Sequence, residues 1–197
     1  SKGDLALAKI CAQWPDARAE MNRRLDRWRQ AGYSFRLDWF LRCINTITTG
    51  EALFTYLATV PVEEFQRGLE KGERHINTLL NLISTRLGLD HDRVLGSRYS
   101  FPLMVRYLDQ KVGPISSQEE RDKLLYWYIQ TFMWGRYAGS TESYLNVDLA
   151  TIESKEEGLD RLIGELRTSR GDLRLTPNDF DGWSKGSRFY PLLYMLT

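Results

Sequence analysis

The chain contains 197 residues, of which 42% are hydrophobic, 12% aromatic and 27% charged. This ordinary globular composition excludes a disordered, collagen-like or coiled-coil chain. With 27 Lys and Arg residues against 26 Asp and Glu residues, the formal charge is +1. That balance excludes a uniformly basic nucleic-acid module, although it leaves a local basic face open.

In the first half of the chain, the spacing of apolar residues predicts five helices. The first is capped by Ser1 or Asp4, and the others cover about 15–30, 34–47, 51–60 and 61–87. The 51–60 segment is ambiguous, and we favour a short helix there. Gly68 and Gly72 weaken the long 61–87 helix by roughly 1 kcal/mol each relative to Ala.

The second half predicts five further helices with clearer start signals. One follows Ser100, and the next is capped by Ser116 or Ser117, each with a Glu three residues later. The remaining three are expected over about 140–152, from a cap at Ser154, and from near Ser187, while Thr176-Pro177 indicates a cap followed by Pro in a first turn. The sequence therefore predicts an all-α chain of eight to ten helices.

The segment from Gly88 to Gly96 looks like a polar link and is the best candidate boundary within the chain. It would separate an N-terminal helical subdomain, residues 1–88, from a C-terminal one, residues 89–197. Residues 96–103 also resemble residues 186–192, through either duplication or recurrent helix-start chemistry. Because the chain lacks an initiator Met and stops inside an apolar run, we expect it to be a fragment of a longer protein.

The sequence indicates no catalytic, cofactor or metal site. His75 and His91 lie outside any Cys/His cluster, and neither a phosphate-binding glycine motif nor a nucleophile elbow is present. Cys11 and Cys43 are too few for a disulfide framework, so we expect buried free thiols in a reducing cytoplasm. No stretch approaches the ~18 apolar residues of a membrane span, so no membrane partner is expected.

Arginine supplies 20 of the 27 positive charges, and its densest run lies between Arg18 and Arg29. On a helix, Arg23, Arg24 and Arg27 would form one basic stripe, with Trp28 beside it. Arginine forms bidentate contacts with phosphate, so the stripe is a candidate DNA contact. A solvated helix face is the alternative interpretation.

A second candidate lies in the aromatic run from Tyr126 to Tyr137. Its rings could stack on bases or form a ligand cage, but a central helix buried on several sides explains them as well. Arg136 follows this helix directly. It could bond carbonyl groups at the helix C-terminus or assist the DNA contact.

Three stretches carry a resemblance to a known family: residues 1–10, 127–149 and 188–193. Over most of its length the chain resembles the helical region that follows the ParB-like nucleotidase domain in GmrSD-type restriction endonucleases. Ser1, Asp4 and Leu5 match the tail of that family's loop-to-helix pattern. The later matches cover the family's aromatic helix, its Arg136-Tyr137 turn and the helix containing Asp148.

The resemblance implies a prokaryotic defence protein, some of whose relatives act on modified DNA. Such proteins join an N-terminal nucleotidase, with an Asp-Gly-Gln-Gln-Arg-like motif, to a C-terminal HNH-type nuclease. Neither catalytic motif occurs here, so no catalytic residue transfers to this sequence. We therefore expect a non-catalytic scaffold whose partners are the flanking nucleotidase and nuclease domains and a second copy of itself. The alternative is a DNA-phosphate-binding module that uses the Arg18–Arg29 stripe.

Overall fold

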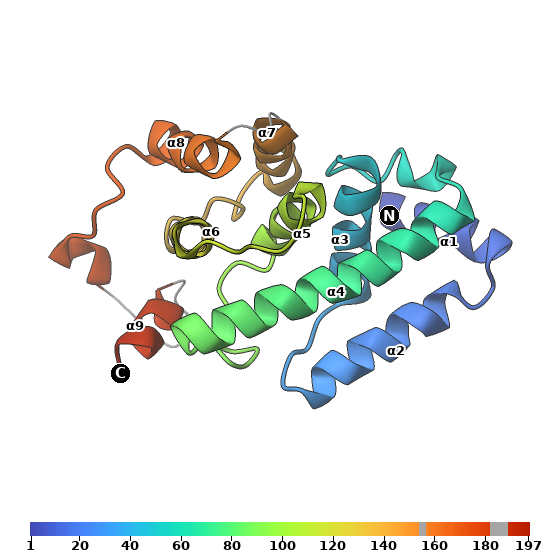
Figure 1. The fold of residues 1–197 in the computed structure, drawn as a ribbon, viewed down its shortest axis with the longest axis horizontal. Coiled ribbons are helices and arrows are strands. Elements are labelled where there is room, and N and C mark those ends of the chain that lie inside the picture. Colours follow the sequence, from blue (N-terminus) through green and yellow to red (C-terminus); the bar gives the residue numbers. More distant parts are fainter. Residues whose placement is uncertain (154–156, 182–188) are drawn as a thin grey trace.

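The computed structural model describes residues 1–153, 157–181 and 189–197 (Figure 1). Within these ranges it contains nine α-helices, two short 3-10 helices and no β-strand. The predicted all-α class with eight to ten helices is therefore confirmed. The elements are α1 (Lys2–Gln13), α2 (Ala17–Gln30), α3 (Leu37–Thr49), η1 (Leu57–Thr59), α4 (Val62–Leu87), α5 (Ser100–Gln110), α6 (Gln118–Met133), α7 (Thr141–Glu153), α8 (Gly158–Arg170), η2 (Pro177–Phe180) and α9 (Tyr190–Leu196).

Several helix ends form where the sequence predicts them. The Ser1 hydroxyl caps α1 by accepting from the Asp4 backbone N–H at 3.2 Å. Ser117 caps α6 in the same way, accepting from the Glu120 N–H at 3.1 Å. At the other end of α4, Gly88 adopts a φ of 71°, which glycine reaches without steric cost.

The predicted helix over 51–60 is wrong: only the three residues of η1 are helical, and the rest forms turns and bends. Side chains from other elements hold the backbone of this segment. Asn45 of α3 donates to two of its carbonyls, at 2.7 and 3.1 Å. The Ala52 N–H donates to the Asn146 side chain of α7 at 2.9 Å. These tertiary bonds replace the i to i−4 bonds of a helix.

At the C-terminal end, two predicted starts fall outside the described residues. The cap at Ser154 and the final start near Ser187 both belong to the omitted segments. The helices themselves are present, since α8 begins at Gly158 and α9 at Tyr190. Thr176 does precede a Pro-led first turn, but that turn is the short 3-10 helix η2.

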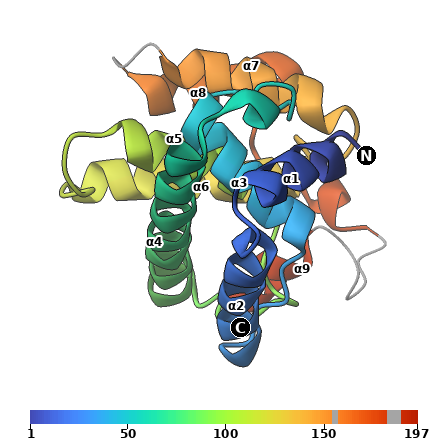
Figure 2. The same ribbon diagram turned by 90° about the vertical axis from the view of Figure 1, so that its right-hand side faces the viewer.

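Helices α3 and α5 occupy the centre of the fold and pack against each other (Figures 1 and 2). The long helix α4 packs across both of them, α5 also contacts α6 and α7, and α8 packs on α6 and α7. One hydrophobic core runs through all of these elements. Its largest fully buried side chains are Trp127, Tyr128, Phe40, Phe65, Phe101, Met21 and Ile44.

The segment between α4 and α5 differs from the solvated polar link that the sequence indicates. Leu89 and Val94 are completely buried, and Leu95 is nearly so. Because α5 also packs on α3 and α4, the core is continuous across residue 88. The division into residues 1–88 and 89–197 stays a prediction.

The contact between α3 and α4 depends on a glycine. A Cβ atom at Gly68 would lie 2.4 Å from the Thr48 hydroxyl oxygen and 3.2 Å from a methyl carbon of Ile44. Gly72, one turn later, faces Phe40 and Ile44 at ordinary contact distances. The propensity cost of glycine within α4 is thus offset at Gly68 by a closer approach of the two helices.

Candidate functional site

Arg24, a predicted phosphate contact, is buried between α2 and α4, which run alongside each other (Figure 1). Its Nε donates to the Glu73 carboxylate of α4 at 2.6 Å. Its Nη1 donates to both the carboxylate and the carbonyl oxygen of Glu20, each at 2.9 Å. The hydrogen bond from Arg24 lowers the pKa of Glu20 below its usual value. This guanidinium therefore joins two helices and has its donors directed at protein carboxylates.

Arg23 and Arg27 lie on the same stripe but remain largely in solvent, with 61% and 55% of their side chains exposed. Arg23 pairs with Glu20 at 2.5 Å, and Arg27 pairs with Glu73. Exposed ion pairs contribute only about 0–1 kcal/mol, so they hold these side chains weakly. The predicted basic stripe thus divides into one buried and two exposed arginines.

Trp28, the aromatic member of the stripe, points into the core. Its indole Nε1 donates to the Asn77 side chain of α4 at 2.7 Å. Its ring makes edge contacts with Phe35, Trp39 and Phe40, with centroid distances from 4.9 to 6.3 Å. Trp28 is therefore a packing residue that fixes α2 on α3 and α4, and its ring face is not presented to a base.

Arg136 is buried with Asp148, with side-chain exposures of 3% and 1%. Its Nη2 and Nε donate to the two carboxylate oxygens at 2.8 and 3.1 Å, and its Nη1 donates to the Ser169 hydroxyl at 2.5 Å. The Tyr137 hydroxyl donates to the same carboxylate at 2.6 Å. The Arg136 side chain therefore connects the turn after α6 to α7 and α8, while its backbone N–H donates to the Thr131 carbonyl in the last turn of α6 at 3.0 Å.

Protonation in this group follows from burial and the shared charge. Burial disfavours the charged guanidinium, but hydrogen bonding and attraction to Asp148 raise the pKa of Arg136 above its usual value. Burial, reinforced by the Asp148 charge, raises the pKa of the Tyr137 hydroxyl well above its usual value. Arg136 is thus cationic and Tyr137 is protonated at neutral pH, so neither side chain changes its charge near pH 7.

The aromatic run behaves as a buried helix, which confirms that interpretation over a ligand cage. Trp127 and Tyr128 are completely buried, and only Tyr126 is substantially exposed. Of the two cysteines, both are free, but only Cys43 is buried and Cys11 is partly exposed.

Sequence reasoning missed the carboxylates that pair with the arginines. Glu73 is 49 residues from Arg24 in sequence, and nothing in the local pattern links them. It also missed a third polar group, in which His75 and Lys71 of α4 contact the Asp109 carboxylate of α5 at 3.1 and 3.3 Å. Burial opposes ionisation of Asp109, but its bond from His75 and the Lys71 charge lower its pKa overall.

Among the residues that the structure describes, no group of three His, Cys, Asp or Glu side chains could hold a metal ion. In the same ranges, no helix combines the length and the apolar character needed to span a bilayer. Comparison with protein-family models, curated proteins and solved structures gave no match to this chain. The resemblance to GmrSD-type endonucleases therefore stays a prediction.

Proposed function

We propose that this chain is a non-catalytic helical scaffold of a GmrSD-like defence protein, which positions a nucleotidase domain against a nuclease domain. The observation that supports the proposal is that the polar clusters of the chain connect one helix to another. Arg24 joins α2 to α4, Asp109 joins α5 to α4, and Arg136 joins the turn after α6 to α7 and α8. Polar side chains that bond one helix to another suit a rigid scaffold, because fully paired buried networks fix a single arrangement of the helices.

The solvent side of α7 supports contact with a flanking domain or a second copy. Tyr144 and Val147 are 40% and 45% exposed and lie three residues apart, so they share one face of the helix. Adjacent exposed apolar side chains are typical of interaction surfaces, whereas single ones need no explanation. Val112, fully exposed in the turn after α5, is such a single residue.

The scaffold proposal is tested with the chain and the separately purified nucleotidase and nuclease domains. We expect complexes with a Kd below about 10 μM by sedimentation, and no nucleotide hydrolysis or DNA cleavage by the chain alone. Val147→Glu should weaken one complex at least tenfold, whereas Val112→Glu, the matched control, should leave both unchanged. Turnover that persists through purification, or failure to bind either domain, would contradict the proposal.

The exposure of Arg23 and Arg27 favours a second candidate, a DNA-phosphate-binding face. Two phosphate contacts give a salt slope of about −1.8, so affinity for a labelled duplex should fall roughly tenfold between 50 and 200 mM salt. Fluorescence anisotropy with the Arg23→Glu/Arg27→Glu variant tests this directly. Unchanged binding by the double variant would refute this second function.

A further inference from the structure

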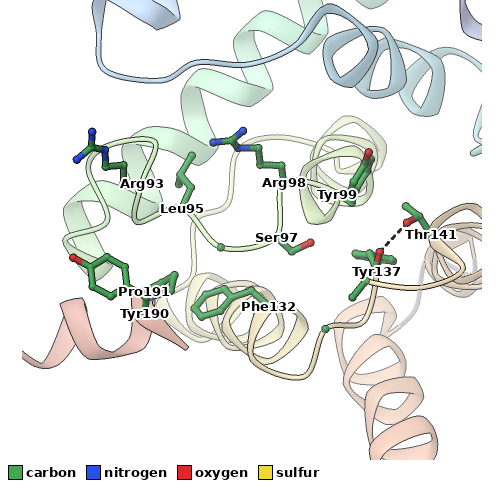
Figure 3. Close-up of a pocket in the computed structure, with 13 residues that line it drawn as sticks. Arg93, Leu95, Ser97, Arg98, Tyr99, Phe132, Tyr137, Thr141, Tyr190 and Pro191 are labelled. Atoms are coloured by element: carbon green, nitrogen blue, oxygen red, sulfur yellow. Dashed lines mark hydrogen bonds between the residues drawn. The ribbon is translucent and has the colours of Figure 1, made fainter. Parts of the chain in front are cut away.

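A hollow of about 670 Å³ lies beside the segment between α4 and α5 (Figure 3). Residues 93–99 form one side, the end of α6 and the following turn form another, and the start of α9 closes a third. Its volume lies within the range of small-molecule sites, which is about 300–1,000 Å³. None of the polar clusters described above accounts for the residues of the 93–99 segment.

The charged side chains in the described lining of this hollow are arginines. Arg93 and Arg98 contribute to it, and among the described residues no Asp or Glu does. The Arg98 guanidinium is paired with Asp92 outside the lining. The Arg93 side chain is exposed and has no ion pair or hydrogen bond within residues 1–153, 157–181 and 189–197. A free guanidinium of this kind presents a planar fork of donors that matches a phosphate.

The aromatic ring of Tyr190 and the hydroxyl of Ser97 are the other ligand-binding groups of the hollow. Figure 3 shows the half-buried Tyr190 ring across the hollow from Arg93, whereas the Phe132 ring is 3% exposed and is covered by Gly96. Flat apolar rings favour a flat heteroaromatic ligand, which stacks without strict sequence preference. The Ser97 hydroxyl, which has no hydrogen-bond partner among the described residues, offers a further donor.

A close contact between the Gly96 backbone and the Phe132 ring holds the floor of the hollow in place. A Cβ atom at Gly96 would lie 2.2 Å from Cδ1 of Phe132, so only glycine lets this loop lie on that ring. The Gly96 N–H also donates to the hydroxyl of the buried Tyr128 at 2.9 Å. The loop is therefore anchored on α6 before any ligand arrives, and such pre-organisation reduces the entropic cost of binding.

We propose that this hollow binds a nucleotide unit, with the base against Tyr190 and the phosphate on Arg93. The two similar segments of the sequence both contribute, since residues 96–99 and Tyr190–Pro191 line it together. The unit is either a free mononucleotide or a nucleotide within a single strand, which share this chemistry. The site goes beyond the scaffold function and does not depend on it.

Isothermal titration calorimetry at 50 mM salt tests the site with AMP, adenosine, inorganic phosphate and a single-stranded deoxyadenosine octamer. We expect AMP or the octamer to bind at least tenfold more tightly than adenosine or phosphate alone, because both halves of the site are then used. Binding of AMP alone assigns a free nucleotide, and binding of the octamer alone assigns a strand.

Two charge-matched variants separate a site from general attraction. Arg93→Glu should weaken binding at least tenfold, whereas Arg67→Glu, an exposed arginine near the far end of α4, should change it less than twofold. Tyr190→Ala should reduce affinity about tenfold through lost stacking. Absence of binding by both AMP and the octamer, or equal losses in the two arginine variants, would overturn the proposal.

Discussion

Replacing Asp148 by Asn tests the buried group around Arg136. The substitution preserves shape but removes the charge that accepts two bonds from Arg136 and one from Tyr137. The guanidinium would then remain buried without the carboxylate with which it is paired. Breaking a buried pair in this way costs about 3–5 kcal/mol. A domain of this size loses about 2–4 °C of Tm per kcal/mol, so the midpoint should fall by about 6–20 °C.

Urea unfolding followed by tryptophan fluorescence and circular dichroism measures this loss. The control is Asp26→Asn, which breaks the exposed pair with Arg29 and should cost less than about 1 kcal/mol. The double variant Arg136→Met/Asp148→Leu should recover most of the stability, because apolar replacement of a whole buried pair is often neutral. A loss below about 1 kcal/mol for Asp148→Asn, or no recovery in the double variant, would refute the reasoning.

Two further predictions concern packing and acid stability. Gly96→Ala should lower the free energy of unfolding by about 1–3 kcal/mol through overlap with Phe132, whereas Gly164→Ala, which meets nothing within 4 Å in α8, should raise it by up to about 1 kcal/mol; equal effects in urea titrations would contradict this. The lowered pKa of Asp109 means that its stabilisation is present above about pH 4 and is lost as the pH falls through the native value. Asp109→Asn should therefore show a smaller loss of stability between pH 5 and pH 3 than the parent, and identical pH profiles would count against the His75 contact.

Local signals predicted the helices well because their causes are local. The cap at Ser117 and the stop at Gly88 each act within one turn, and both form as expected. The 51–60 segment was mispredicted because Asn45 and Asn146 hold its backbone from elsewhere in the fold. Propensity carries no information about such tertiary bonds.

The candidate DNA contacts also depend on tertiary contacts that local sequence patterns do not reveal. The sequence places Arg24 and Arg136 beside other arginines and aromatics. Arg24 has one local partner, Glu20, but its other carboxylate partner lies 49 residues away, and the partner of Arg136 lies 12 residues away. Periodicity did identify Trp28 and the α6 aromatics as features that need an explanation. Whether such a ring faces solvent or core depends on how helices pack, and that is settled only by the assembled fold.

The glycine contact between α3 and α4 has a mechanical consequence. Gly68 lies 19 residues before Leu87, so the crossing point is about 29 Å from the far end of α4 at 1.5 Å per residue. If α4 moves as a stiff lever about this pivot, a tilt of about 2° displaces its tip by about 1 Å. That tip leads directly into residues 88–99. A methyl group added at Gly68 would therefore displace residues at the far end of α4.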